Sequence, residues 1–424
     1  MDRLVVRLRR FRRLFILLAV IGPGLITTNA GNDAGAIATY SQAGAEFGFR
    51  MLWILVIITI SLAVVNEMGS RMAVVTGKGL ADLIRERFGV RSTTFAMVLL
   101  LVANAVTTMA EFAGVAAALE LFGVPRYVSV PAIALMIWLV IVRGSYPVVE
   151  RVLLSIGLVY LAYIASGIVS HPRWGEVVTS IVIPRPVPTV GYFLLAIGLI
   201  GTTIAPWMLF YLQSSVAEKG IPDEQLAYSR IDAVSGAIFA DLVAFFIIVA
   251  AAVALYGKLA PDQLANMQAG DYARALAPVV GRGAFVLFGI GLLGASLLSG
   301  GVVPLSTAYT VTEAFGWERG VGQRFGEAPA FFGIFTGLIV VGGLAVLIPG
   351  VPLVPMILLS QEINGLILAV ILVYMMVLVN DRRIMGRYVN GPVINVVGYA
   401  TVALLVVLIG LFLFSALPGS ALSG

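Results

Sequence analysis

The chain has 424 residues, of which 60% are hydrophobic and only 12% are charged. Soluble domains contain about 25% charged residues, so this chain could not cover a water-facing surface, and a soluble enzyme is excluded. It has no cysteine and one histidine, which removes disulfides, thiol catalysis and most His-based metal sites.

Long apolar runs recur along the whole chain, and most can cross a bilayer as a helix. We predict an all-α polytopic membrane protein in which residues 1–424 form one transmembrane domain. The first run is not a cleaved signal peptide, because it is too long and Gly, Pro, Asn and Asp interrupt it. Short surface helices are expected in the longest connections, near 171–189 and 257–281. The eleven predicted spans are 14–45, 51–73, 94–122, 128–143, 149–170, 190–216, 230–256, 283–310, 329–348, 353–379 and 393–416.

The basic residues are unevenly distributed over the connections between these spans. If the N-terminus is cytoplasmic, the connections on its side of the membrane hold most of the 27 Lys and Arg residues. The positive-inside rule then predicts a cytoplasmic N-terminus and a C-terminus outside, and we place the chain in a prokaryotic inner or plasma membrane. The net charge of +5 reflects this topology, so the expected partner is the lipid bilayer and not nucleic acid. The oligomeric state stays open.

The middle of the first span, Thr27 to Ala36, has an unusual composition for a membrane helix. It contains two glycines, two asparagines and an aspartate, all of which are poor helix formers. A kinked helix that packs through small residues would explain this composition. The alternative is a discontinuous helix whose carbonyl groups and Asp33 line a cation site, because freed backbone in a bilayer needs partners.

A second interruption lies in the sixth span, at Gly201 to Met208, where Pro206 removes a backbone donor. The two interruptions lie at corresponding positions of two five-span halves. Paired broken helices of this kind indicate an inverted-repeat transporter with its site near the middle of the membrane. We predict a first repeat over about 14–170, a second over about 190–379, and an eleventh helix over about 393–416.

We single out five ionisable residues inside predicted spans, and all five are acids that would attract a cation. Glu111 is either a pathway acid or a structural hydrogen-bonding partner. Glu67 and Asp241 either cap structure or take part in transport. The five are Asp33, Glu67, Glu111, Asp241 and Glu362.

Motifs along nearly the whole chain resemble the Nramp divalent-metal transporter family. The resemblance implies a LeuT-type fold, in which two inverted five-helix repeats with broken first and sixth helices precede an eleventh helix. The matching segments are Gly22-Pro23-Gly24 through Gln42-Ala43-Gly44-Ala45, Val75-Thr76-Gly77-Lys78 with Leu80-Ala81, Ala110-Glu111 with Gly114, Glu150-Arg151-Val152, Ser360-Gln361, and Asp381 through Arg387.

The resemblance also implies the ligands of a transported metal ion. Asp33 matches the family's metal-binding aspartate, Ala30 and Thr202 would offer carbonyl groups, and Gln361 would approach from the tenth helix. Outer-shell positions are Asn29, Asn32, Thr203 and Ala205, and the pathway candidates are Glu111 and Glu67.

The chain departs from the family pattern at several of these positions. The asparagine ligand is replaced by Ala36, the methionine ligand by Ala205 and the neighbouring histidine by Trp207. The aspartate of the third helix is Thr108, and the arginine expected in the ninth helix is missing from Pro329 to Ile334.

These losses predict which ion is transported and whether its transport is coupled to protons. Removing a soft thioether ligand reduces the preference for transition metals, and a site with few direct ligands suits Mg²⁺, which keeps several waters. The pattern resembles the divergent magnesium transporters related to Nramp. We therefore expect alternating-access transport of partly hydrated Mg²⁺, and also Mn²⁺, without a cofactor. Transport should not be coupled to protons, because a single remaining acid, Glu111, makes a poor relay.

Two alternatives remain. One is an ordinary proton-coupled Mn²⁺/Fe²⁺ importer with relocated ligands. The other is an organic-solute symporter of the same fold that binds a carboxylate, which the negative charge of Asp33 disfavours.

Overall fold

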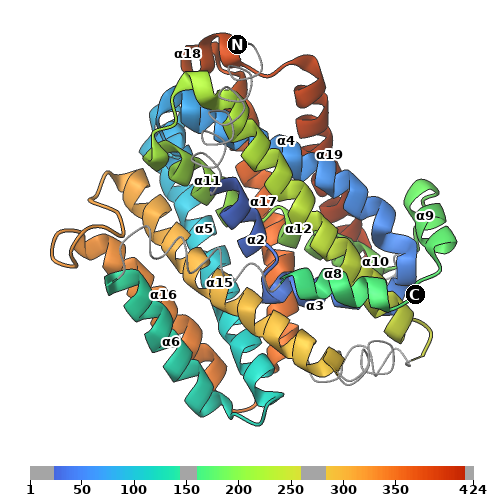
Figure 1. Ribbon diagram of the computed structural model, residues 1–424. Helices are drawn as coiled ribbons and strands as arrows, with labels where there is room; N and C mark the ends of the chain where they lie inside the picture. Colours follow the sequence, from blue (N-terminus) through green and yellow to red (C-terminus); the bar gives the residue numbers. More distant parts are fainter. Residues whose placement is uncertain (1–22, 144–159, 259–282, 416–424) are drawn as a thin grey trace, which may run out of the picture.

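The computed structural model describes residues 23–143, 160–258 and 283–415, and these contain helices and no strand (Figure 1). The predicted fifth span is described only in its second half, and Glu150-Arg151-Val152 and most of the 257–281 connection lie outside the described residues. The helices are α2 (Pro23–Ala30), α3 (Ala34–Phe47), η1 (Gly48–Met51), α4 (Leu52–Thr76), α5 (Leu80–Glu120), α6 (Arg126–Arg143), α8 (Leu161–Val169), α9 (Trp174–Val182), α10 (Val190–Thr203), α11 (Pro206–Lys219), η3 (Asp223–Gln225), α12 (Leu226–Leu255), α15 (Gly283–Phe315), α16 (Pro329–Leu347), α17 (Leu353–Asn380), α18 (Arg382–Met385), η4 (Gly386–Tyr388) and α19 (Pro392–Ser415).

Both predicted helix breaks are confirmed. The first span is divided into α2 and α3 around Gly31–Asp33, and the sixth into α10 and α11 around Ile204–Ala205. Pro206 occupies the first turn of α11, where its missing N–H costs nothing. Composition alone located these breaks because the residues there cannot sustain a helix.

The helices pack in pairs that belong to the two halves of the chain. α4 lies against α12, and α5 lies along α15. The broken helices are in the centre: α2 and α3 pack on α12, and α10 packs on α17 (Figure 1). The outer flank beside α5 and α15 is formed by α6 and α16. This arrangement encloses both breaks within the bundle.

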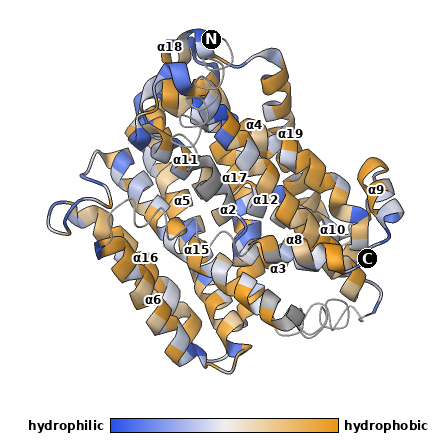
Figure 2. Ribbon diagram, in the orientation of Figure 1, coloured by the Kyte–Doolittle hydropathy of each residue, from blue (hydrophilic) through white to orange (hydrophobic). Residues whose placement is uncertain are grey.

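The outward surface of the bundle is apolar. Nine stretches of the described residues are long and apolar enough to cross a membrane, and one of them, Ala34–Thr76, covers the end of the first predicted span and all of the second. Figure 2 shows apolar residues along the length of α6, α12 and α16, while hydrophilic colour gathers at connections such as that between α15 and α16. Exposed side chains such as Leu344 (60%) and Val406 (56%) match a lipid surface and not a soluble one.

Several boundaries differ from those predicted. α5 begins at Leu80 and not near 94, and Gly89, with φ of 78°, kinks it where an L-residue would be strained. α15 continues to Phe315, beyond the predicted residue 310. The surface helix expected near 171–189 is confirmed as α9.

The inventory of buried charges was also incomplete. Glu313 and Asp232 are buried acids at the ends of spans, and Arg71 is a buried cation, so the expectation that all such residues are acids was wrong. They were missed because charge near a span end looks like a connection to solvent.

Candidate metal site at the helix breaks

Asp33 starts the second part of the broken first helix. Its Oδ1 accepts a hydrogen bond of 2.6 Å from the Ala36 amide, so the carboxylate caps α3. Asp33 is 1% exposed. Before it, the Gly31 amide donates to the Thr27 carbonyl at 3.1 Å and ends the α2 hydrogen-bond pattern. A negatively charged group is thereby fixed at a helix N-terminus inside the bundle.

Two side chains from other helices meet Asp33. Oε2 of Glu111, from α5, accepts a hydrogen bond of 3.3 Å from the amide of Ala34, the residue after Asp33. Gln361 from α17 places Nε2 at 3.5 Å from Asp33 Oδ1. The first break is therefore lined by two buried carboxyl groups and one amide group.

Gly35 makes the approach of Gln361 possible. A Cβ at Gly35 would overlap Nε2 and Cδ of Gln361 and would lie 2.8 Å from its Cγ. The Gln361 amide also donates to Ser360 Oγ at 3.1 Å, and its Oε1 accepts from Asn364 at 3.4 Å. Gln361 is fully buried, so its amide position is determined by these contacts.

The second break brings the backbone at the end of α10 close to Gln361. The end of α10 lies on α17, because a Cβ at Gly201 would overlap the Gln361 carbonyl oxygen. Thr202 is fully buried and its hydroxyl has no partner among the described residues. Thr203 donates to the Leu199 carbonyl or bonds the Tyr40 hydroxyl at 2.8 Å. The predicted ligand Thr202 and its neighbour Thr203 thus lie where α10 meets α17 and α3.

Polar groups just before Asp33, at the end of α2 and in the first break, already have hydrogen-bond partners. The Ala30 carbonyl accepts from Ser299 Oγ of α15 at 2.5 Å, and Asn32 donates to the Ala240 carbonyl of α12 at 3.0 Å. The side chain of Asn29 lies outside the described residues. Ser299 was not singled out from the sequence, although Ser296 and Ser299 are three residues apart in an apolar span and therefore share a helix face.

Glu67 is not brought to the Asp33 group. Its carboxylate makes ion pairs with Arg71 at 2.9 Å and with Arg230 at 2.7 Å. Arg71 also donates to Asn390 Oδ1 at 2.5 Å, which links α4 to the segment before α19. Asp241 is buried in α12, and neither of its oxygens has a hydrogen-bond partner among the described residues.

The positions that depart from the family pattern carry no charge. Thr108 donates to the Asn104 carbonyl at 2.7 Å, and Trp207 is fully buried with its ring N–H unpartnered by the described residues. Ala205 is buried at the second break. One thioether is nearby: the Met208 sulfur would lie 2.9 Å from a Cβ at Gly31. The described residues contain no cluster of three or more His, Cys, Asp or Glu side chains suited to a metal.

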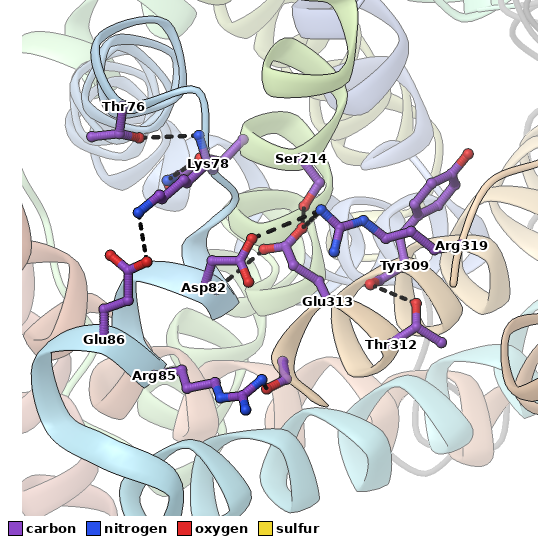
Figure 3. A network of polar contacts seen from close by, with 12 residues as sticks. Thr76, Lys78, Asp82, Arg85, Glu86, Ser214, Tyr309, Thr312, Glu313 and Arg319 are labelled. Atoms are coloured by element: carbon purple, nitrogen blue, oxygen red, sulfur yellow. Dashed lines mark hydrogen bonds and ion pairs between the residues drawn. The ribbon is translucent and has the colours of Figure 1, made fainter. Parts of the chain in front are cut away.

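A polar network closes one end of the bundle near these helices (Figure 3). Glu313 of α15 accepts from Ser214 Oγ of α11 at 2.8 Å and from the Asp82 amide of α5 at 3.3 Å. Arg319 lies 3.8 Å from both Glu313 and Asp82. Because a Cβ at Gly79 would overlap the Glu313 carboxylate, the turn before α5 must also stay free of side-chain atoms. The network connects α5, α11 and α15.

The same end carries Asp381, just before α18. Its carboxylate accepts from the Arg383 amide at 2.9 Å and from the Arg87 guanidinium at 2.8 Å. These two donors hold the pKa of the Asp381 carboxyl below its usual value of 3.8.

A family profile described as natural resistance-associated macrophage protein-like, Nramp, matches residues 24–415. The chain belongs to the Nramp family. Curated relatives named divalent metal cation transporter MntH include one from Aeromonas hydrophila, 28% identical over 92% of this chain and 94% of its own length. Another, from Ralstonia nicotianae, is 30% identical over 92% of this chain and 89% of its own length. Nramp proteins are metal-ion transporters and not enzymes, so the metal is cargo here and no cofactor is involved.

Solved structures agree on the fold. A manganese transporter from Eremococcus coleocola has a TM-score of 0.78 at 21% identity, covering 94% of this chain and 86% of that one. MhsT in complex with L-phenylalanine has a TM-score of 0.59 at 15% identity, covering 96% and 98%. The LeuT-type fold expected from the sequence is therefore confirmed.

Proposed function

We propose that this divalent-metal transporter of the Nramp family carries Mg²⁺, and also Mn²⁺, held partly hydrated beside Asp33. The proposed ligands are hard oxygens: the Asp33 carboxylate, the carbonyls of Ala30 and Thr202, and the amide oxygen of Gln361 once this side chain, whose Nε2 now faces Asp33, turns over. Hard oxygen ligands suit Mg²⁺ and Mn²⁺. The names of the similar proteins, divalent metal cation transporter and manganese transporter, support a divalent cargo.

The observation that carries the proposal is the set of methyl groups at Ala36 and Ala205. Ala36 offers the site only its amide, which is donated to Asp33, and buried Ala205 offers no side-chain donor. An ion there keeps waters in place of the missing ligands, as Mg²⁺ does in proteins. Met208 is the feature that favours the alternative, since a thioether beside Gly31 would suit Mn²⁺ or Fe²⁺.

Uptake into proteoliposomes tests the ion and the ligand together. Wild-type protein should take up Mg²⁺ and Mn²⁺, and millimolar Mg²⁺ should compete with Mn²⁺ uptake. Asp33→Ala should abolish both, while Asp33→Asn keeps the helix cap and so serves as a folding control that also lacks the charge. If a well-folded Asp33→Ala variant takes up metal at the wild-type rate, this site is refuted. If Mg²⁺ does not compete with Mn²⁺ uptake, the alternative of an ordinary Mn²⁺/Fe²⁺ importer is favoured.

We also propose that transport is not coupled to protons. Thr108, Trp207 and α16 supply no titratable group in place of those of the family pattern, so Glu111 is the one acid of that set that this chain keeps. The burial of Asp33 and Glu111 next to each other is the feature that favours coupling, because two neighbouring carboxyl groups can share a proton that metal binding would displace. A pH-sensitive dye inside the liposomes decides: acidification that follows metal uptake would refute uncoupled transport.

The orientation is part of the same proposal. Basic residues of the predicted cytoplasmic connections lie in polar contacts at one end of the bundle. Arg319 lies in the Glu313 network (Figure 3), and Arg87 pairs with Asp381 just before α18. This supports a bacterial inner-membrane protein with that end in the cytoplasm, its N-terminus inside and its C-terminus outside. The repeats, over about 14–170 and 190–379, would alternate access by rocking around the two breaks.

A further inference from the structure

An acidic cavity lies close to the Asp33 group, on the side of it away from the Glu313 network. It has a volume of about 170 Å³. Its polar lining is Thr39, Gln42 and Glu46 of α3 and Glu362 of α17, and Leu194 and Gly198 of α10 form part of its apolar wall.

The cavity is continuous in the fold with the proposed metal site. Thr39 is one helical turn after Gly35 on the same face of α3, and Glu362 directly follows Gln361 in α17. Gly198 is one turn before Thr202 in α10. The three helices that bring Asp33, Thr202 and Gln361 together therefore also form the walls of this cavity.

The lining is acidic, and no Lys or Arg lines the cavity. Glu46 accepts a hydrogen bond of 2.6 Å from Gln42, whereas Glu362 makes no hydrogen bond or ion pair with the described residues. Thr39 is 1% exposed, and its hydroxyl has no partner in the described part of the chain. Two carboxyl groups, with an unsatisfied hydroxyl in the wall behind them, suit a cation that retains its water.

The size of the cavity fits such an ion. Mg²⁺ is octahedral and loses its waters reluctantly, so it needs room for several of them. A cavity of about 170 Å³ has room for a divalent ion that keeps several of its waters.

We propose that this cavity is an entry subsite that captures a hydrated divalent cation, through Glu46 and Glu362, before it moves to Asp33. The inference rests on the proposed function and adds a second binding position to it. Two carboxylates in a partly enclosed, low-dielectric pocket raise the local cation concentration and the rate of capture. The contacts pass through water, so the subsite holds the ion weakly enough to release it inward.

Kinetics of Mg²⁺ uptake test the capture step. The double variant Glu46→Gln/Glu362→Gln should raise KM about tenfold at low ionic strength and leave Vmax near the wild-type value. The difference should shrink in high salt, which screens the attraction. Glu176→Gln is the matched control, because this acid is exposed on α9 and outside the cavity. A KM within twofold of wild type, or a fall in Vmax without a change in KM, would overturn the subsite.

A second measurement does not depend on the double variant folding. The chain has no cysteine, so Leu194→Cys introduces a single thiol on the cavity wall with both acids intact. A membrane-impermeant maleimide added from outside should label it, and millimolar Mg²⁺ should slow the labelling several-fold. Absence of labelling, or labelling that Mg²⁺ leaves unchanged, contradicts the proposal. If wild-type protein takes up metal while these results fail, only the entry subsite is wrong, whereas absent wild-type uptake removes the proposed function itself.

Discussion

Replacing Gly35 with alanine should damage the metal site without touching a charged residue. Gly35 has no positive φ, so alanine is allowed by the backbone, and the damage comes from the clash with Gln361. Gln361 cannot retreat easily, because it is fully buried and held by Ser360 and Asn364.

The magnitude follows from the clash and the lost contacts. Overpacking of a buried position costs about 1–3 kcal/mol. Losing the contacts of Gln361 with Asp33 and Ser360 costs about 1 kcal/mol each, and the better helix propensity of alanine returns about 1 kcal/mol. We expect a net destabilisation of about 2–4 kcal/mol. Displacing a group that positions a metal typically lowers affinity about 10–100-fold, so KM for Mg²⁺ should rise by that factor.

The assay combines thermal unfolding of the purified protein with Mg²⁺ uptake. Gly301→Ala is the matched control, because a Cβ there would meet only Ile137, at an ordinary 3.7 Å. The double variant Gly35→Ala/Gln361→Ala removes the clashing atoms and should recover stability but not uptake. Wild-type KM in Gly35→Ala, or full recovery of uptake in the double variant, would refute the argument.

Three further outcomes are expected. Arg71→Ala should lower the unfolding free energy by about 3 kcal/mol, because it leaves buried Glu67 short of a partner, whereas half-exposed Arg230→Ala should cost much less; melting temperatures compare them. Met208→Leu should leave Mg²⁺ uptake unchanged, and a selective loss of Mn²⁺ uptake would instead reveal a thioether ligand. The lowered pKa of Asp381 means that its interactions contribute above its usual value of 3.8 and are lost as pH falls further; Asp381→Asn should therefore destabilise at pH 6–8, and melting curves should converge with wild type near pH 3.

The breaks could be predicted from the sequence because their cause is local. Asp33, the neighbouring glycines and Pro206 are poor helix formers, and no bilayer-exposed segment tolerates such residues without other partners. The hydrophobic spans were predictable for a similar reason, since crossing a bilayer sets their length.

The contacts that complete the site could not be predicted in this way. Ser299 donates to the Ala30 carbonyl, and Glu111 accepts from the Ala34 amide, only because α15 and α5 cross the first break at this level of the bundle. The Glu313 network depends on the unexpected start of α5 at Leu80. Helix crossings depend on packing between distant segments, which one sequence does not reveal.

The self-capped start of α3 has a mechanical consequence. Among the described residues no backbone hydrogen bond joins α2 to α3, because the Asp33 side chain serves the first amides of α3. α2 can therefore rotate about the break as a rigid lever, while the first turn of α3 stays helical. Three of the hydrogen bonds that restrain α2 and the break run from Gly24 to Asp232, from Asn32 to the Ala240 carbonyl and from Ser299 to the Ala30 carbonyl. At about 1 kcal/mol each, these bonds add about 3 kcal/mol to the packing of α2 on α12, and breaking them opens the hinge beside the cargo without unwinding a helix.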